Sequence, residues 1–264
     1  NARITVPYNK NEPASAAEIV DRRKPRNFID EQIDEQLARL ALPASPACND
    51  AEFLRRASID AVGRTPTADE VRAFLADPSE NRRDALIDRL LASPEFVDYW
   101  TYKWCDVLTL NGTRLRPAAL KTYYQWVRKQ VADGVPWDRF VREIVTASGE
   151  SVENGATNFY ALSQSPEDMT ENVSQAFLGL SIGCAKCHNH PFERWTQDDY
   201  YNFAAFFAQI GRKPGVLPGE EVVFNAGGGE VKQPRTGRVM PPKGLGGPVL
   251  DDASRDRRAR LAAW

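Results

Sequence analysis

The sequence predicts a mainly α-helical protein: a multi-helix bundle with a small C-terminal β-hairpin and an extended loop. Two observations predict the bundle: apolar residues recur at helical spacing from Asn27 to about residue 210, and capping residues precede the apolar runs. Past Gly211, β-branched residues and a glycine-rich turn replace this pattern and predict the hairpin. The 264 residues are enough to bury one large core or two modest ones.

The predicted helices follow one another closely. One begins after Asn49, and the next begins at Thr67, where Glu70 lies three residues on and completes a capping box. A third ends at Ser93-Pro94. Further helices are expected over residues 94–108, 117–132, 137–147, 165–180 and 196–210, and a polar loop over 148–164.

The C-terminal part of the chain has a different character. Residues Glu221–Asn225 and Glu230–Gln233 flank three glycines and predict the two strands of the hairpin, and the segment RTGRVMPPKGLGGP follows as an extended loop. We therefore expect four segments: an N-terminal arm over 1–26, a helical cofactor-binding domain over 27–210, the hairpin and loop packing on it over 211–250, and the cut start of a following domain over 251–264.

The composition excludes some classes of partner. Lysine and arginine number 34 against 36 acidic residues, a net charge of −2, which gives no reason to expect a nucleic-acid or anionic-membrane partner. No apolar run is long enough to be a transmembrane segment. The beginning of the chain lacks the features of a secretory signal, so the protein is either cytosolic or has lost its signal.

The most informative segment begins at Gly183 and contains Cys184-Ala-Lys-Cys187-His188. C-x-x-C-H is the attachment pattern of c-type haem. Cys184 and Cys187 lie one helical turn apart, so both thiols would add to the vinyl groups on one haem edge, and His188 would bind the iron. Both histidines of the chain occur here, in an aromatic-rich surround, so the motif predicts one covalent haem c.

Three other interpretations use the same residues. A structural zinc site would need a second close pair of ligands, and Cys48 and Cys105 are isolated. A thioredoxin-like dithiol expects a strand before a helix, whereas this motif lies between predicted helices. An iron–sulfur cluster needs four clustered thiolates, and only Cys184 and Cys187 are close in sequence. Haem is therefore favoured, with zinc as the main rival.

The sixth iron ligand is a separate question. Met240, on a proline-stiffened loop, is the leading candidate, Met169 is another, and either would otherwise simply fill an apolar gap. His190 lies only two residues after His188, so it would more readily reach a haem propionate or a buried network than the opposite haem face. An open sixth position stays possible.

Side chains around the motif have both a cofactor-binding and a plain interpretation. Trp195 and Tyr201 would wall the haem or would simply belong to the core, and Arg194 would pair with a propionate or be solvated. Outside the cytoplasm, Cys48 and Cys105 would favour a disulfide over two buried thiols, although their geometry is not given by sequence.

The chain also resembles a known family, the planctomycete cytochrome family, in its helical domain of formerly unknown function. Three blocks carry the resemblance: CAKCHNHPFERWTQDDYYNFAAFF from Cys184, DAEFLRR through GRTPT at residues 50–67, and LASPEF at 91–96 followed by Trp104. The resemblance runs from Asn27 to Gly247 and implies a haem c protein of planctomycete-type bacteria in the periplasm or another extracytoplasmic space. Residues 255–264 resemble the opening of the second domain usual in this family.

These observations lead to three hypotheses of function. The first is a c-type cytochrome that transfers single electrons to other redox proteins or cytochrome modules, because no catalytic constellation is recognisable elsewhere. The second is a haem-containing redox enzyme whose open iron acts on peroxide or carbohydrate together with a further domain. The third is a zinc-stapled helical binding module without redox activity. The first is favoured, so an electron-transfer protein is expected rather than a catalyst.

Overall fold

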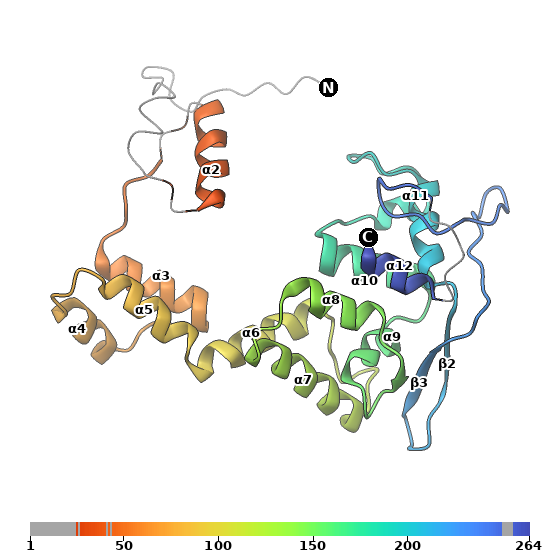
Figure 1. Ribbon diagram of the computed structural model, residues 1–264, viewed down its shortest axis with the longest axis horizontal. Helices are drawn as coiled ribbons and strands as arrows, with labels where there is room; N and C mark the ends of the chain where they lie inside the picture. The colour runs from red at the N-terminus through yellow and green to blue at the C-terminus, as the bar shows by residue number, and fades with distance from the viewer. Residues whose placement is uncertain (1–24, 26, 41, 43, 250–255) are drawn as a thin grey trace. The chain divides into compact units, whose positions relative to one another are not determined.

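The computed structural model describes residues 25, 27–40, 42, 44–249 and 256–264. They divide into two compact units: the first comprises the described residues up to 56 together with 66–83, and the second comprises 57–65 and the described residues from 84 onward. The expected N-terminal arm lies outside the described residues, apart from Pro25. The mainly α fold class is confirmed, since the helices are accompanied by one small antiparallel sheet (Figure 1).

The first unit contains α2 (Phe28–Arg39), α4 (Ala68–Ala76) and the first half of α3 (Asp50–Val62). The capping box predicted at the start of α4 is present: the Thr67 hydroxyl accepts from the Glu70 amide at 3.2 Å, and the Glu70 carboxylate accepts from the Thr67 amide at 2.6 Å. Such a box satisfies two amides that a helix start otherwise leaves without partners. Local sequence therefore determines where this helix begins.

One acidic residue organises the rest of the first unit. Asp50, at the start of α3, pairs with Arg82 and, at 2.7 Å, with Arg83. Hydrogen bonds from these two guanidinium groups lower the pKa of the Asp50 carboxyl. The Arg83 guanidinium also lies 4.7 Å from the ring centre of Phe53, which in turn stacks with Phe74. Arg83 thus contacts both the Asp50 carboxylate and the Phe53 ring in the small apolar core of this unit.

The second unit is built on a large apolar core. Its helices are the later part of α5 (Arg82–Leu91), α6 (Pro94–Val107), α7 (Pro117–Ala132), α8 (Trp137–Val145), α9 (Asn158–Leu162), α10 (Pro166–Leu178), α11 (Gln197–Ala204) and α12 (Arg257–Ala263). Aromatic rings fill its centre, and those that are almost fully buried are Tyr123, Phe159, Tyr160, Tyr200, Phe203, Phe206 and Phe207. No described helix has the length and apolar composition needed to cross a bilayer.

The expected loop over residues 148–164 is more ordered than its polar composition suggests. It contains the short strand β1 (Gly149–Glu150), a 3₁₀ turn at Gly155–Thr157 and the buried helix α9. The Asn154 side chain caps the turn by accepting from the Ala156 amide at 3.2 Å. Gly155 lies so close to Trp126 that an added Cβ would stand 2.3 Å from that side chain. Gly155 therefore allows close packing against Trp126. The prediction of a loop was wrong for residues 155–162, which form the 3₁₀ turn and α9.

The hairpin also differs from its prediction. β3 (Glu221–Asn225) forms as expected, but it pairs antiparallel with β2 (Ile210–Pro214), and β1 lies on its other edge. The expected partner strand at 230–233 instead forms a single bridge between Lys232 and Val239. The predicted helix over 196–210 ends earlier, in a 3₁₀ turn at Ala205–Phe207, which releases residues 210–214 for the sheet.

Helix α12 belongs to the second unit, where it contacts α8 and the 3₁₀ turn at Ala205–Phe207 (Figure 1). Arg258 is only 1% exposed. Its guanidinium donates to the Ala147 carbonyl at 2.6 Å, to the Ser148 hydroxyl at 2.9 Å and to the Asp256 carboxylate at 2.8 Å. A buried cation with this many partners fixes α12 against the end of α8.

We expect the substitution Arg258→Met to lower the free energy of unfolding by about 3 kcal/mol, because Asp256 and the Ala147 carbonyl would lose their charged partner. Urea unfolding followed by circular dichroism measures the change. The control is Arg260→Met, an exposed arginine of the same helix, for which the loss should be below about 0.5 kcal/mol. Equal losses in both variants would contradict the anchoring role.

Candidate haem-attachment site

The candidate site is a single exposed turn held by buried residues. We refer to the 3₁₀ turn η2 (Gly183–Lys186), together with Cys187 that follows it, as the attachment turn. It is closed by the Ala185 amide, which donates to the Ile182 carbonyl at 2.8 Å. Ile182 and Ala185 are 1% and 0% exposed, whereas Cys184, Cys187 and His188 are exposed. The apolar residues thus fix the turn to the core, and both thiols lie on its outer side within one turn.

Neighbouring helices hold this turn through its central lysine. The Lys186 carbonyl accepts from the side-chain Nε2 of Gln197 at 2.9 Å and from the Tyr201 hydroxyl at 3.1 Å, both on α11. The Lys186 ammonium lies 3.8 Å from the Glu171 carboxylate on α10, which also accepts from the Tyr200 hydroxyl at 2.8 Å. Because Lys186 lies between the two cysteines, these contacts determine where both thiols are held.

His188 has the geometry of a ready metal ligand. Its Nδ1 lies 2.8 Å from the Asn189 carbonyl oxygen, which can only accept, so Nδ1 carries the proton. The other nitrogen, Nε2, has no hydrogen-bond partner in the part of the chain that the structure describes, and its lone pair is free. A metal-bound histidine commonly has this arrangement, because the hydrogen bond at Nδ1 fixes the tautomer and the ring orientation.

His190 is engaged at both ring nitrogens. Nε2 lies 3.1 Å from the Ser181 carbonyl, and Nδ1 accepts from the backbone amides of Phe192 at 3.3 Å and Glu193 at 2.9 Å. Its own amide donates to the Trp195 carbonyl at 2.8 Å. His190 therefore closes the loop that follows the attachment turn. To bind iron it would have to give up at least one of these hydrogen bonds.

The loop closed by His190 displays Phe192, whose side chain is 92% exposed. Asn189, which starts the loop, accepts from the Gln197 amide through its side chain at 3.0 Å, so the loop is tied to the beginning of α11. Sequence reasoning did not identify Asn189, Gln197 or Glu171 as parts of the site. Nothing in the local pattern of Gln197 or Glu171 signals a role, since each acts through a contact with another segment. Asn189 acts on His188 through its backbone carbonyl, which every residue has.

The three side chains expected around a haem occupy different environments. Trp195 and Tyr201 are 8% and 6% exposed and belong to the core. Arg194 is exposed, and its guanidinium lies 4.6 Å from the ring centre of Trp195. Burial raises the pKa of the Tyr201 hydroxyl, with further contributions from the charges of Glu167 and Cys187. Tyr201 therefore lies behind the attachment turn rather than out in solvent.

Met240 and Met169 are both 2% exposed. Met169 lies within α10, whereas Met240 lies in an irregular segment where its amide donates to the Val231 carbonyl at 2.9 Å. This segment is linked to the attachment turn: the Gln233 side chain donates to the Gln197 side chain at 2.9 Å, and Gln197 donates to the Lys186 carbonyl. The segment 231–240 is thus hydrogen-bonded, through Gln233, to α11, the helix that contacts the attachment turn.

The other two cysteines are free. Cys48 is partly buried in the first unit, and Cys105 is buried in α6 of the second. A disulfide between them would join the two units, so the bridge that the sequence favoured stays a prediction. Burial raises the pKa of the Cys105 thiol to about 11, so this thiol is protonated at neutral pH and behaves as a small apolar side chain.

Within the described ranges, no three histidine, cysteine, aspartate or glutamate side chains gather in an arrangement that would hold a metal ion. A structural zinc takes about four converging ligands. A covalent haem makes a smaller demand, since the two thiols bond to the porphyrin and one imidazole binds the iron. Cys184, Cys187 and His188 fit that demand.

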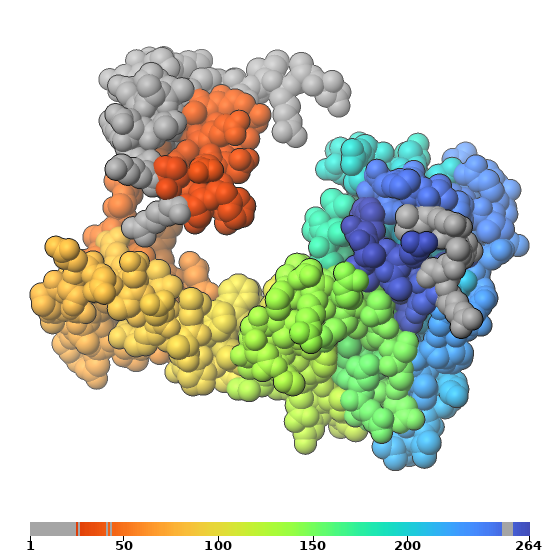
Figure 2. Space-filling view, in the orientation of Figure 1, coloured from red at the N-terminus to blue at the C-terminus, as the bar shows by residue number. Residues whose placement is uncertain are grey.

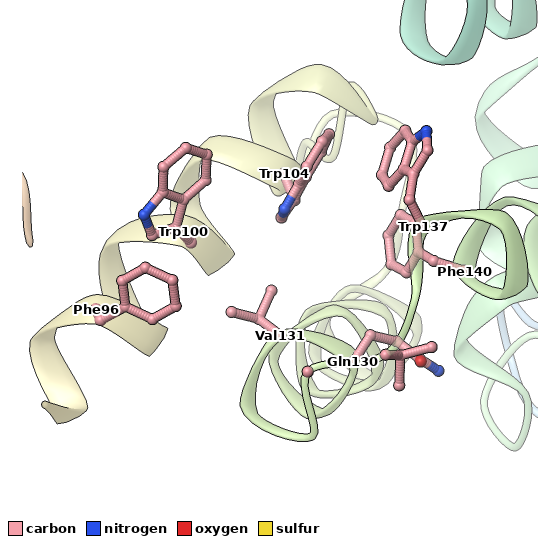
Figure 3. A pocket seen from close by; sticks show the side chains of 9 residues that line it. Phe96, Trp100, Trp104, Gln130, Val131, Trp137 and Phe140 are labelled. Carbon is pink, nitrogen blue, oxygen red and sulfur yellow. The ribbon is translucent and has the colours of Figure 1, made fainter. Parts of the chain in front are cut away.

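A second candidate site lies on α6, α7 and α8. Aromatic and aliphatic side chains line a hollow of about 360 Å³ between Phe96, Trp100, Trp104, Val131 and Trp137 (Figure 3). The Trp104 indole nitrogen faces the open space, whereas those of Trp100 and Trp137 point away from it (Figure 3). The aromatic residues at 96, 100 and 104 are spaced four apart, which predicts that their side chains lie on one face of a helix. This spacing is the sequence signal that points to the aromatic wall of the hollow.

The comparison with protein families gives one match. The family model described as "PSCyt2: Protein of unknown function (DUF1549)" matches residues 28–212, which cover both units and include the attachment turn. No curated protein matches the chain, and no solved structure does. The family resemblance is confirmed over these residues, while the description of the family assigns no chemistry to any of them.

We expect Gln197→Leu to loosen the attachment turn, because the Lys186 carbonyl would lose one donor and Gln233 would lose its acceptor. Hydrogen exchange of the backbone amides over 184–190 should accelerate by about tenfold, which corresponds to the loss of one or two hydrogen bonds. Gln125→Leu, at an exposed position of α7, is the matched control and should leave these amides unchanged. Unchanged exchange in the Gln197 variant would show that the turn is held by other contacts.

Proposed function

The chain belongs to the PSCyt2 family, which is associated with planctomycete cytochrome-like proteins. We propose that it is a c-type cytochrome that transfers single electrons. One observation carries the proposal: Cys184 and Cys187 lie exposed on one rigid turn, directly before a histidine whose Nε2 is free. A haem bound there would supply an iron that cycles between its ferrous and ferric forms.

The protein's own residues would perform three tasks. The thiols of Cys184 and Cys187 would bond to one edge of the porphyrin and fix its position. The Nε2 of His188 would bind the iron. The hydrogen bond from Nδ1–H to the Asn189 carbonyl would hold the imidazole ring in place and increase its basicity. Gln197 and Tyr201 would keep the turn from moving when the iron changes charge.

The exposure of this face supports electron transfer to docked proteins. Cys184, Cys187 and His188 are all exposed, and Phe192, four residues after His188, is 92% exposed, so a cofactor bound there would be close to the protein surface. Arg194, also exposed, is the residue that we propose for a haem propionate. Covalent haem attachment is an extracytoplasmic process, so we propose a periplasmic or similar location and other redox proteins or cytochrome modules as partners.

Met240 is the residue that we propose as the sixth ligand. It lies outside any helix and is tied to the attachment turn through Gln233 and Gln197, whereas leaving the core would require Met169 to unravel part of α10. His190 is a weaker candidate because both of its ring nitrogens are engaged. Met240 would have to leave a core position in which it is 2% exposed.

That same burial favours a second candidate function. If Met240 stays in the core, the iron has an open sixth position, which is what a redox enzyme acting on peroxide or carbohydrate would need. The zinc-stapled binding module is the third possibility, and it draws its only support from the pair of exposed thiols. The optical spectrum and the metal content separate these functions.

We expect the chain, produced in a host with haem-attachment machinery, to carry one haem that stays with the polypeptide on a denaturing gel and stains for peroxidase activity. Replacing both attachment cysteines (Cys184→Ala with Cys187→Ala) should abolish the stain because no thioether would remain. Cys48→Ala removes a thiol outside the motif and should keep it. A colourless wild type, or one zinc and no iron by metal analysis, would overturn the proposal.

We expect the wild-type haem to be low-spin and to show the weak far-red band of methionine bound to ferric iron. Met240→Leu should abolish this band and produce a high-spin form that binds cyanide, because leucine keeps the volume but offers no ligand. Met169→Leu should keep the band. A wild type that is already high-spin and shifts with cyanide or peroxide would favour the enzyme.

A further inference from the structure

The end of the β2–β3 hairpin exposes apolar side chains. Val216 is 90% exposed and Leu217 is 53% exposed in the loop that joins the two strands, and Figure 2 shows this light blue end at the surface of the second unit. On β3, Phe224 is 37% exposed. Adjacent apolar residues at such exposure are unfavourable in water unless another surface covers them.

The loop that carries them is rigid. The Gly215 amide donates to the Glu220 carbonyl at 2.9 Å, and the Glu220 amide donates to the Leu217 carbonyl at 3.0 Å. The Glu220 carboxylate also accepts from the Leu217 amide at 2.9 Å, and Glu220 is only 4% exposed. These hydrogen bonds close the loop on which Val216 and Leu217 are exposed, and the carboxylate of Glu220 accepts one of them.

Basic side chains surround this loop. Arg114, Arg116, Arg212 and Lys213 line, together with it, a hollow of about 570 Å³. Arg114 donates to the Leu162 carbonyl at 2.7 Å, and Arg212 donates to the backbone carbonyls of Tyr160, Ser163 and Gln164. These carbonyls hold the two guanidinium groups in place without neutralising their charges. Among the described ion pairs, none includes any of these four cations.

The local charge differs in sign from that of the whole chain. Four cations and two carboxylates, those of Glu220 and Glu221, line the hollow, which leaves a local charge of +2 against −2 for the whole chain. Lys213 also lies 5.9 Å from the ring centre of Phe224, so a basic and an aromatic side chain occupy the same face of the hairpin. Apolar and basic groups are thus combined on one projecting element.

We propose that this hairpin end binds the surface of an anionic phospholipid bilayer. Val216 and Leu217 enter the interfacial region, and Arg114, Arg116 and Lys213 contact the headgroup phosphates. This occupant matches both features: a free anion would leave the apolar residues exposed, and a purely apolar partner would leave the cations without counterions. Attachment of this kind needs no membrane-spanning helix and does not depend on haem.

The test is sedimentation of the full chain with vesicles of phosphatidylcholine alone or mixed with phosphatidylglycerol. Binding to the anionic vesicles is expected, and it should weaken as salt is added. Arg116→Gln and Lys213→Gln should each weaken the partition coefficient by about fivefold, as expected for one basic residue near the membrane surface. Val216→Ser should also weaken it, because the hydroxyl is less favourable in the interface.

Two matched controls lie elsewhere in the second unit. Lys103→Gln removes one exposed positive charge from α6, and Val249→Ser alters a valine that is 55% exposed, and neither should change the partition. The proposal is overturned by equal binding to neutral vesicles, by no binding, or by full competition from inorganic phosphate. Binding to polyglutamate in place of vesicles would instead assign the surface to an acidic protein.

Discussion

The two hydrogen bonds to the Lys186 carbonyl are the contacts on which the candidate site depends. A haem-attachment turn must be exposed, so that both thiols are accessible, and rigid, so that the following histidine has a defined direction. Exposed turns are seldom rigid by themselves, because water competes for their polar groups. Here Gln197 and Tyr201 bind the carbonyl between the two cysteines, and Ile182 and Ala185 anchor the turn in the core.

The same contacts explain why α11 and the segment after the hairpin belong to the site. Gln197 receives a hydrogen bond from Gln233 and donates to Lys186, so a displacement of residues 231–240 would reach the attachment turn through one side chain. His190 acts locally in the same sense, because it uses both ring nitrogens to close the loop after the turn. His190 thus binds the backbone through both ring nitrogens, whereas the Nε2 of His188 has no hydrogen-bond partner among the described residues.

Net charge describes this molecule poorly. Four of the ion pairs that the structure describes join residues three or four apart in the sequence, and such exposed pairs contribute little to stability. The cations around the β2–β3 hairpin are different, because they come from segments a hundred residues apart, and Arg114 and Arg212 bind carbonyls rather than acids. An average over the sequence hides that concentration.

The helical architecture, the capping box at Thr67 and the C-x-x-C-H motif could be read from the amino-acid sequence alone, because each depends on residues that lie within one or two turns of each other. The partner of β3 and the helical order of residues 155–162 became visible only in the folded chain. Folding also brings Gln197 and Glu171 into contact with Lys186, and Gln233 into contact with Gln197. The difference lies in sequence separation. A helix cap or a short motif involves residues close together in the sequence, whereas strand pairing, burial and the hydrogen bonds to the Lys186 carbonyl involve segments that only folding brings together.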